Sequence, residues 1–176
     1  GAVRAGPGRG QAVPAGTTIR GELAFDGNAS LGDFTGTTTT LTGALIGAGT
    51  LEAVRGWVEA PSGTLVTGNG RRDRDMYKSL EVERYPVLRF DLAALAAGEP
   101  VGDSIPVTLR GRFTLHGVSR EEAVRGWVWL RDGAVRFRGA LPIRLTEYRI
   151  GGLSKFLGAL RMHEEIVVRV DVEFGR

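Results

Sequence analysis

The sequence predicts an all-β protein built from eight antiparallel strands, and three observations lead to this fold class. Apolar and polar residues alternate one by one from Thr17 onward, which is the pattern of half-buried strands. Glycine and proline, 27 and 7 of the 176 residues, cut the chain into short pieces. A strand–helix–strand rhythm is missing, which favours a barrel or a sandwich over a parallel sheet. One-sided alternation over eight strands favours the closed barrel, because closure removes exposed strand edges.

The eight predicted strands follow one another at regular spacing. In 107–116, for example, Val107, Leu109 and Phe113 share one face, with Arg110 on the other. Further upstream, the four threonines 37–40 favour β structure through their stiff χ1 angles. The predicted strands are 19–25, 34–45, 50–59, 87–92, 107–116, 123–130, 135–145 and 166–174.

Turn residues separate these strands. Asp132-Gly133, between two long strands, is a strong signal for a two-residue hairpin. His116-Gly117 is predicted to turn the preceding pair of strands. Asp26-Gly27-Asn28 and Asn69-Gly70 are predicted to form two further turns.

Two segments have helical rather than strand spacing. In 72–82, both Met76 and Tyr77 lie within about one helical turn of Leu80. The second segment, 152–160, places four apolar residues on one helical face: Leu153, Phe156, Leu157 and Leu160. We therefore expect two short helices outside the strands.

Length and composition limit the domain organisation and the class of partner. The length suits one domain with a sizeable core. Residues 1–16 carry little to bury and no export signal, so they are predicted to be a flexible N-terminal leader before a barrel at 17–176. The absence of cysteine excludes a disulfide scaffold, a thiolate zinc site and a cysteine nucleophile. A net charge of +3, with both signs interspersed, argues against a nucleic-acid partner.

The sequence offers few catalytic or metal-binding constellations. It contains two histidines, His116 and His163, and lacks the G-x-S-x-G elbow of many hydrolases. His116 falls in a predicted hairpin turn, where support of the backbone is favoured over proton transfer. His163 and Glu164 are neighbours on the last strand and point to opposite faces, so they do not converge on one ion. We therefore predict no catalytic residue, no metal and no cofactor.

The interior of the predicted barrel is the more informative feature. An eight-stranded barrel is just wide enough to fill with its own side chains or to hold one small ligand. Its inward face carries Phe90, Phe113 and Phe137 beside the small residues Gly111 and Gly139. Such a mixture leaves a cavity or fits the taper of a solid core, and composition leaves both readings open.

An ordered set of short motifs runs through residues 17–176. They are Thr67-Gly68-Asn69-x-x-Arg72-Asp73-x-x-Met76, Tyr85-Pro86-x-Leu88-x-Phe90, Leu115-His116-Gly117-Val118-Ser119-Arg120, Tyr148-x-Ile150 and Glu165-Ile166-Val167-Val168. In this order and spacing the chain resembles the YceI-like family of bacterial polyisoprenoid-binding, lipocalin-like proteins. The resemblance implies an extended lipocalin-like antiparallel barrel that holds a long isoprenoid chain in its apolar interior. Together with the pattern above, the predicted fold is an eight-stranded antiparallel lipocalin-like barrel with two short helices.

The resemblance also implies a location, partners and site residues. Members are typically exported, so it implies a periplasmic or secreted protein, and some members form dimers, so a homodimer stays open. Leu88 and Phe90 would face the lumen, and Tyr148 and Ile150 match an aromatic-x-Ile position near the barrel rim. The apolar segment 152–160 departs from common members. Phe156 in it is a candidate for a lid or for transient contact with a membrane, and the alternative is that its helix simply packs on the end of the barrel.

The leading hypothesis is a non-enzymatic protein that binds, carries or sequesters a long apolar lipid, an isoprenoid or an isoprenoid quinone. Burial of a chain contributes about 0.8 kcal/mol per CH₂ without directed polar contacts. The predicted ligand-binding residues are Phe25, Leu88, Phe90, Phe113, Phe137, Leu141, Tyr148, Ile150 and Phe156.

Two other functions stay open. One is an enzyme that acts on a small apolar or lipid-like substrate at the barrel mouth, with His163, Glu164 or Arg71 at the site. The other is a structural or partner-binding barrel whose core is completely filled.

Overall fold

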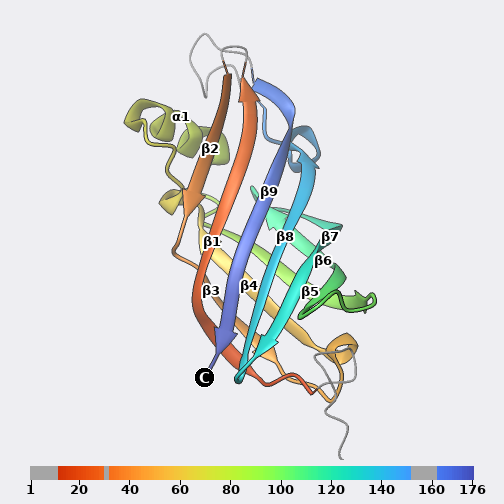
Figure 1. Ribbon diagram of the computed structural model, residues 1–176. Helices are drawn as coiled ribbons and strands as arrows, with labels where there is room; N and C mark the ends of the chain where they lie inside the picture. Colours follow the sequence, from red (N-terminus) through yellow and green to blue (C-terminus); the bar gives the residue numbers. More distant parts are fainter. Residues whose placement is uncertain (1–11, 30–31, 152–161) are drawn as a thin grey trace, which may run out of the picture.

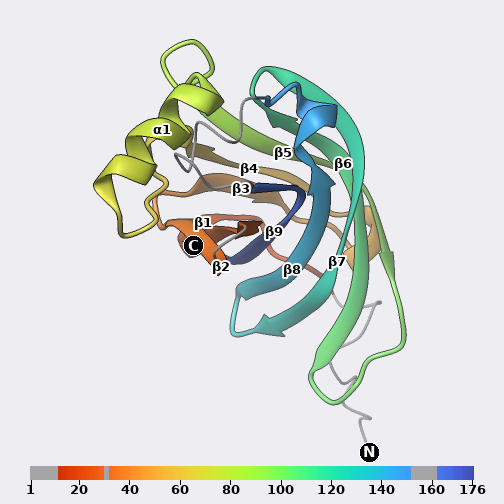
Figure 2. The ribbon, with the colours of Figure 1, turned by 90° about the horizontal axis from the view of Figure 1, so that it is seen from above.

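The computed structural model describes residues 12–29, 32–151 and 162–176. Most of these residues lie in one antiparallel sheet that curls into a barrel, seen from the side in Figure 1 and from one end in Figure 2. The strands are β1 (Gly16–Ala29), β2 (Gly32–Thr38), β3 (Thr42–Ile46), β4 (Arg55–Pro61), β5 (Val87–Ala97), β6 (Ser104–Leu115), β7 (Val118–Arg131), β8 (Ala134–Arg144) and β9 (Met162–Gly175).

The barrel closes through β1, which bonds to strands on both of its edges. One edge pairs with β9 along most of its length, from Thr17 to Ala29. The other edge pairs with β3 at Gly16 and Thr17 and with β2 from Leu23 onward. The remaining strands pair in chain order from β3 to β9, so eight strands form the closed circuit and β2 extends it beside β1. The predicted all-β, eight-stranded antiparallel barrel is confirmed.

Two predicted strands differ from the structure at their ends. The segment 34–45 is not one strand: it is divided into β2 and β3, with 39–41 between them. The segment 50–59 does not begin as a strand either, because Leu51–Ala53 forms a 3₁₀ turn. Leu51 and Val54, three residues apart, are both buried, which is helical rather than strand spacing.

Two of the turns predicted from the sequence join strands as expected. Asp132-Gly133 and His116-Gly117 each join consecutive strands, and all four residues have positive φ angles between 46° and 76°. This is the backbone of a type I′ hairpin turn. The turn predicted at Asp26-Gly27-Asn28 is wrong, because these residues lie within β1 and pair with β2.

Helix α1 (Gly70–Leu80) confirms the first predicted helix and lies beside β2 in Figure 1. Asn69 caps its first turn by accepting a hydrogen bond from the backbone N–H of Arg72, at 3.0 Å. Met76 and Leu80 are buried on the face toward the barrel. We call the end of the barrel at α1 the helix end. The second predicted helix, 152–160, lies outside the described residues.

The barrel wall has a seam at the helix end, between β7 and β8. The ladder between them runs from Arg131↔Ala134 to Arg125↔Ala140, and β7 continues to Val118 without β8 as its neighbour. A 3₁₀ turn, Leu145–Tyr148, follows β8 at this point. Its two buried side chains, Leu145 and Tyr148, close the seam together with Ile150.

Candidate ligand-binding lumen

The barrel encloses an apolar cavity of about 130 Å³, which we call the lumen. Its walls come from the alternate residues of nearly every strand in the circuit. At the end opposite α1, Val13 and Leu51 line it as well, and Val13, which falls in the predicted leader, is buried and pairs with Ala48. The main side chains of the lining are Leu23, Leu45, Val58, Leu88, Phe90, Leu92, Leu95, Leu109, Phe113, Val124, Val128, Val135, Phe137, Leu141, Val168, Val170, Val172 and Phe174.

Glycines on the inner face let phenylalanine rings lie close against the barrel wall. A Cβ at Gly111 would lie 2.8 Å from the Cζ atom of Phe90, and one at Gly126 would lie 2.8 Å from the Cε2 atom of Phe137. A Cβ at Gly139 would also overlap the ring of Phe137. The rings therefore occupy space that side chains at these positions would fill.

Several lining residues keep accessible surface although they point inward. Each alternates along its strand with outward-facing neighbours, as Leu109 does between Thr108 and Arg110. Their accessible surface therefore faces the lumen, which marks a space that is not completely filled. These half-buried lining residues are Leu45, Val58, Phe90, Leu92, Leu109 and Val170.

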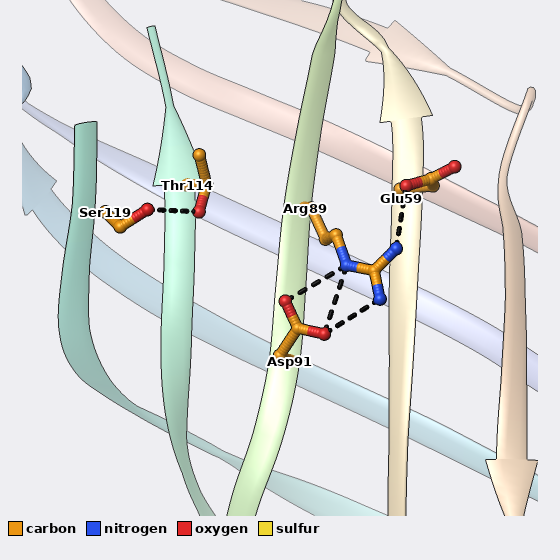
Figure 3. Close-up of polar contacts among 5 residues, drawn as sticks. All are labelled: Glu59, Arg89, Asp91, Thr114 and Ser119. Atoms are coloured by element: carbon orange, nitrogen blue, oxygen red, sulfur yellow. Dashed lines mark hydrogen bonds and ion pairs between the residues drawn. The ribbon is translucent and has the colours of Figure 1, made fainter. Parts of the chain in front are cut away.

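Polar contacts on the outer face link β5, the strand that carries Phe90, to β4. Arg89 and Asp91 flank Phe90 on β5 and face outward, where the Arg89 guanidinium pairs with Asp91 and, at 3.1 Å, with Glu59 on β4 (Figure 3). The same guanidinium lies over the Trp57 ring, 4.4 Å from its centroid. Asp91 raises the pKa of Arg89, which stays charged. These contacts lie on the outer face of the sheet, opposite the Phe90 side chain, which lines the lumen.

The structure brings together five of the predicted ligand-binding residues. Leu88, Phe90, Phe113, Phe137 and Leu141 all line the lumen. Three others lie elsewhere. Phe25 and Ile150 line a second, smaller cavity at the helix end, and Tyr148 is fully buried without lining either cavity. Phe156 lies outside the described residues.

Tyr148 belongs to the seam between β7 and β8. Its ring packs edge-on against Phe113, with 5.6 Å between centroids, and its hydroxyl donates a hydrogen bond to Glu122 Oε1 at 2.9 Å. Burial and the carboxylate of Glu122 raise the pKa of Tyr148 well above its ordinary value. Arg120 lies 3.9 Å from Glu122 and 3.4 Å from Glu147, so the carboxylate at the seam is balanced by a cation.

His116 ties the same turn to helix α1. One ring nitrogen, Nδ1, lies 2.9 Å from the backbone oxygen of Tyr148, and the other, Nε2, contacts the carboxylate of Glu81 just after α1. Tyr85 packs edge-on against the imidazole, 5.0 Å between centroids, and also covers Gly117, where a Cβ would clash with its ring. Residues of three of the quoted motifs therefore meet at the helix end, where they hold backbone segments together.

The Thr67–Met76 motif shapes the loop before α1. Asp73 accepts hydrogen bonds from the backbone N–H and the hydroxyl of Thr67, at 2.8 and 2.6 Å. Tyr77 donates its hydroxyl proton to the backbone oxygen of Leu65 at 2.6 Å. These contacts position Met76 over the second cavity.

Sequence reasoning missed many lining residues, although the alternation contained them. Val58, Leu92 and Val170 all occupy inward positions of predicted strands but are not among the predicted ligand-binding residues. Glu122 was missed for a different reason: its partner Tyr148 is 26 residues away and meets it only in the folded barrel.

The residues named for an enzyme at the barrel mouth are not brought together by the described structure. Arg71 is exposed on α1, and the side chains of His163 and Glu164 lie outside the described part of the chain. Within the described residues, no three His, Asp or Glu side chains gather as a metal site would require. The described segments also contain no helix long and apolar enough to span a bilayer.

Comparison with known proteins agrees with this architecture. The family model of the YceI-like domain matches residues 13–174. No curated protein sequence matches the chain. Among solved structures, the polyisoprenoid-binding domain from Saccharophagus degradans implicated in plant cell wall breakdown has a TM-score of 0.75, with 16% identity, and the match covers 93% of this chain and 98% of that one.

Two further structures share the fold. BcnA of Burkholderia cenocepacia has a TM-score of 0.72 at 15% identity, with 87% of this chain and 95% of that chain covered. The YceI protein of Campylobacter jejuni has a TM-score of 0.55 at 14% identity, with 69% and 72% covered. At these identities the likeness concerns the fold.

Proposed function

The chain belongs to the family of YceI-like domains, and from this membership and its apolar lumen we propose that it binds and carries, or sequesters, an apolar lipid of the isoprenoid type. The single observation that carries the proposal is the lumen of about 130 Å³ lined by apolar side chains. A related structure described as a polyisoprenoid-binding domain, from Saccharophagus degradans, supports the choice of ligand class.

The size of the lumen defines how such a ligand would bind. An engineered apolar cavity of about 150 Å³ stays dry and takes up benzene. The lumen is of similar size, so it accommodates a short piece of a branched apolar chain as it stands. A longer chain gains about 0.8 kcal/mol for each further CH₂ that it buries, and this gain must exceed the cost of moving lining side chains.

The proposed ligand-contacting residues are those that already line the lumen. Phe90 and Phe137 lie close against glycines of the neighbouring strands and line the lumen, so their rings would contact a chain in the centre. Leu88, Phe113 and Leu141 would contact the part of the chain nearest the helix end. The proposal assigns binding without chemical turnover to these side chains.

The proposal places the protein in the periplasm or outside the cell, with transient contact to a membrane where the lipid is collected or released. It also includes a homodimer as a form of the carrier. Fractionation of the cells that make the protein tests the location. Flotation with vesicles and light scattering of the purified chain test the membrane contact and the dimer.

A matched pair of variants tests whether the lumen binds the lipid. Leu109 points into the lumen and Thr108, its neighbour, points out, and both are half-buried. We expect Leu109→Trp to fill the lumen and to weaken binding of a fluorescent polyprenol at least tenfold. Thr108→Trp should bind as the wild type does. Equal binding by both variants and the wild type, with all three folded, would place the lipid outside the lumen.

A further inference from the structure

The second cavity, at the helix end, lies next to the lumen along the barrel axis. It has a volume of about 20 Å³ and apolar walls from β1, β2, β9, α1 and the 3₁₀ turn. Phe25, Gly36 and Met76 are among its lining residues, and none of the lumen's lining residues is shared with it. Two separate apolar spaces therefore lie within one barrel.

One row of inward side chains has members that line each of the two spaces. In the sheet, Phe25 of β1 pairs with Val168 of β9, which in turn pairs with Leu141 of β8. Val168 and Leu141 line the lumen, whereas Phe25 lines the second cavity. Leu23, the inward residue that precedes Phe25 on β1, lines the lumen as well. Phe25 is the largest side chain of this row, and we infer that the row forms a partition between the two spaces.

On the side of β2, the neighbour of Phe25 in the sheet has no side chain, because it is Gly36. A Cβ at Gly36 would find its nearest neighbours at ordinary contact distances, 3.5 Å from the Thr67 methyl and 3.7 Å from the Met76 sulfur. Met76 is an unbranched side chain that adapts to irregular spaces. Thr67 and Met76 therefore leave room for no more than a methyl group at Gly36, and the Phe25 ring can move toward Gly36 only if the Met76 side chain shifts with it.

We propose that the second cavity is the distal subsite for the end of the lipid chain and that Phe25 limits the length of chain the barrel accepts. The inference rests on the proposed function, because it assumes that the lumen holds an apolar chain. A short chain fits within the lumen with Phe25 in place. A longer chain passes the partition only when the ring moves toward Gly36, and its end then lies beneath α1.

The test is a length series of linear polyprenols, from geraniol to solanesol and beyond, titrated against the whole chain. We expect Phe25→Ala to join the two cavities and to tighten binding of the long members about tenfold, with the short members unchanged. Gly36→Ala should do the opposite, weakening only the long members, because the added methyl group occupies the second cavity. Phe90→Ala is the control, since it removes an equal ring from the wall of the lumen and should shift all lengths alike.

The outcomes separate the inference from the function on which it rests. If the wild type binds no polyprenol of any length, the proposed function is wrong. If the wild type binds and the length profiles of Phe25→Ala and Phe90→Ala run parallel, the lumen binds lipid but Phe25 does not limit its length. Where Phe25→Ala does not fold, Phe25→Leu together with Gly36→Ala decides: opposite shifts confined to long chains support the inference, and unchanged profiles overturn it.

Discussion

The hydroxyl of Tyr148 donates a hydrogen bond to the carboxylate of Glu122 at 2.9 Å, across the seam where β7 and β8 part. Tyr148 is fully buried there, and its ring packs on Phe113, which lines the lumen. A side-chain contact between a 3₁₀ turn and a strand thus joins a part of the wall where the described residues form no ladder between β7 and β8. The integrity of the lumen at this place depends on this pair.

Removal of the Tyr148 hydroxyl should destabilise the barrel. Tyr148→Phe keeps the ring on Phe113 but leaves Glu122 without its donor. Hydrogen bonds to charged groups contribute roughly 1.5–3 kcal/mol to stability. We expect the free energy of unfolding to fall by an amount toward the lower end of this range, because Glu122 keeps some access to water and a cation nearby. Urea unfolding measures the loss. A Tyr148→Phe, Glu122→Gln double-mutant cycle with no coupling energy would show that the pair does not act together.

Stability should also fall at alkaline pH through Tyr148. Burial raises the pKa of Tyr148 in the folded state, so the unfolded chain releases this proton at a lower pH than the folded barrel does. The stabilising contribution is complete below the unfolded pKa of about 10 and is lost progressively as the pH rises above it. Unfolding free energies measured across this range should decline more steeply for the wild type than for Tyr148→Phe. Parallel curves would contradict the assignment.

A methyl group at Gly139 should disturb the lumen rather than the outer surface. The Cβ of Gly139→Ala would overlap the Phe137 ring and force it toward the centre of the barrel. We expect a loss of about 1–3 kcal/mol in unfolding free energy, the usual cost of overpacking, together with weaker lipid uptake. Gly63→Ala is the control, because a Cβ there meets nothing within 4 Å. Equal unfolding free energies and equal lipid uptake of the two variants would mean that the Phe137 ring does not lie against Gly139.

Removal of the Arg89 guanidinium should leave lipid uptake unchanged. Arg89 pairs with Asp91 and Glu59 on the outer face, and its side chain is 36% exposed. Exposed ion pairs contribute about 0–1 kcal/mol, so Arg89→Ala should lower the unfolding free energy by no more than about this amount plus a small loss from the Trp57 contact. A large loss of polyprenol binding in this variant would place the ligand on the outer face.

The sequence predicted those features that depend on local pattern. Alternation identified the inward face that carries Phe90, Phe113 and Phe137, because side chains in a strand point alternately to its two faces. Asp132-Gly133 placed a hairpin correctly, since both residues tolerate the positive φ of the turn. At Asp26-Gly27-Asn28 the same reasoning failed, because pairing with strands on both edges overrides the turn preference of these residues.

Other features depend on contacts between distant segments and could not be read from the pattern. The free volume of the lumen depends on how the Phe137 ring lies over Gly126 and Gly139, which come from two different strands. The placement of Phe25 in a separate cavity depends on its register with Val168, some 140 residues away in the chain. Pattern alone assigns Phe25 and Phe137 to the same inner face and does not distinguish their cavities.

Mass spectrometry of an organic extract from gently purified protein tests the central claim most directly. The account predicts an isoprenoid lipid in the extract, in an amount that approaches one molecule per chain and that falls sharply in Leu109→Trp but not in Thr108→Trp. An extract without lipid, from a folded wild-type protein whose melting temperature does not rise when polyprenols are added, would contradict it.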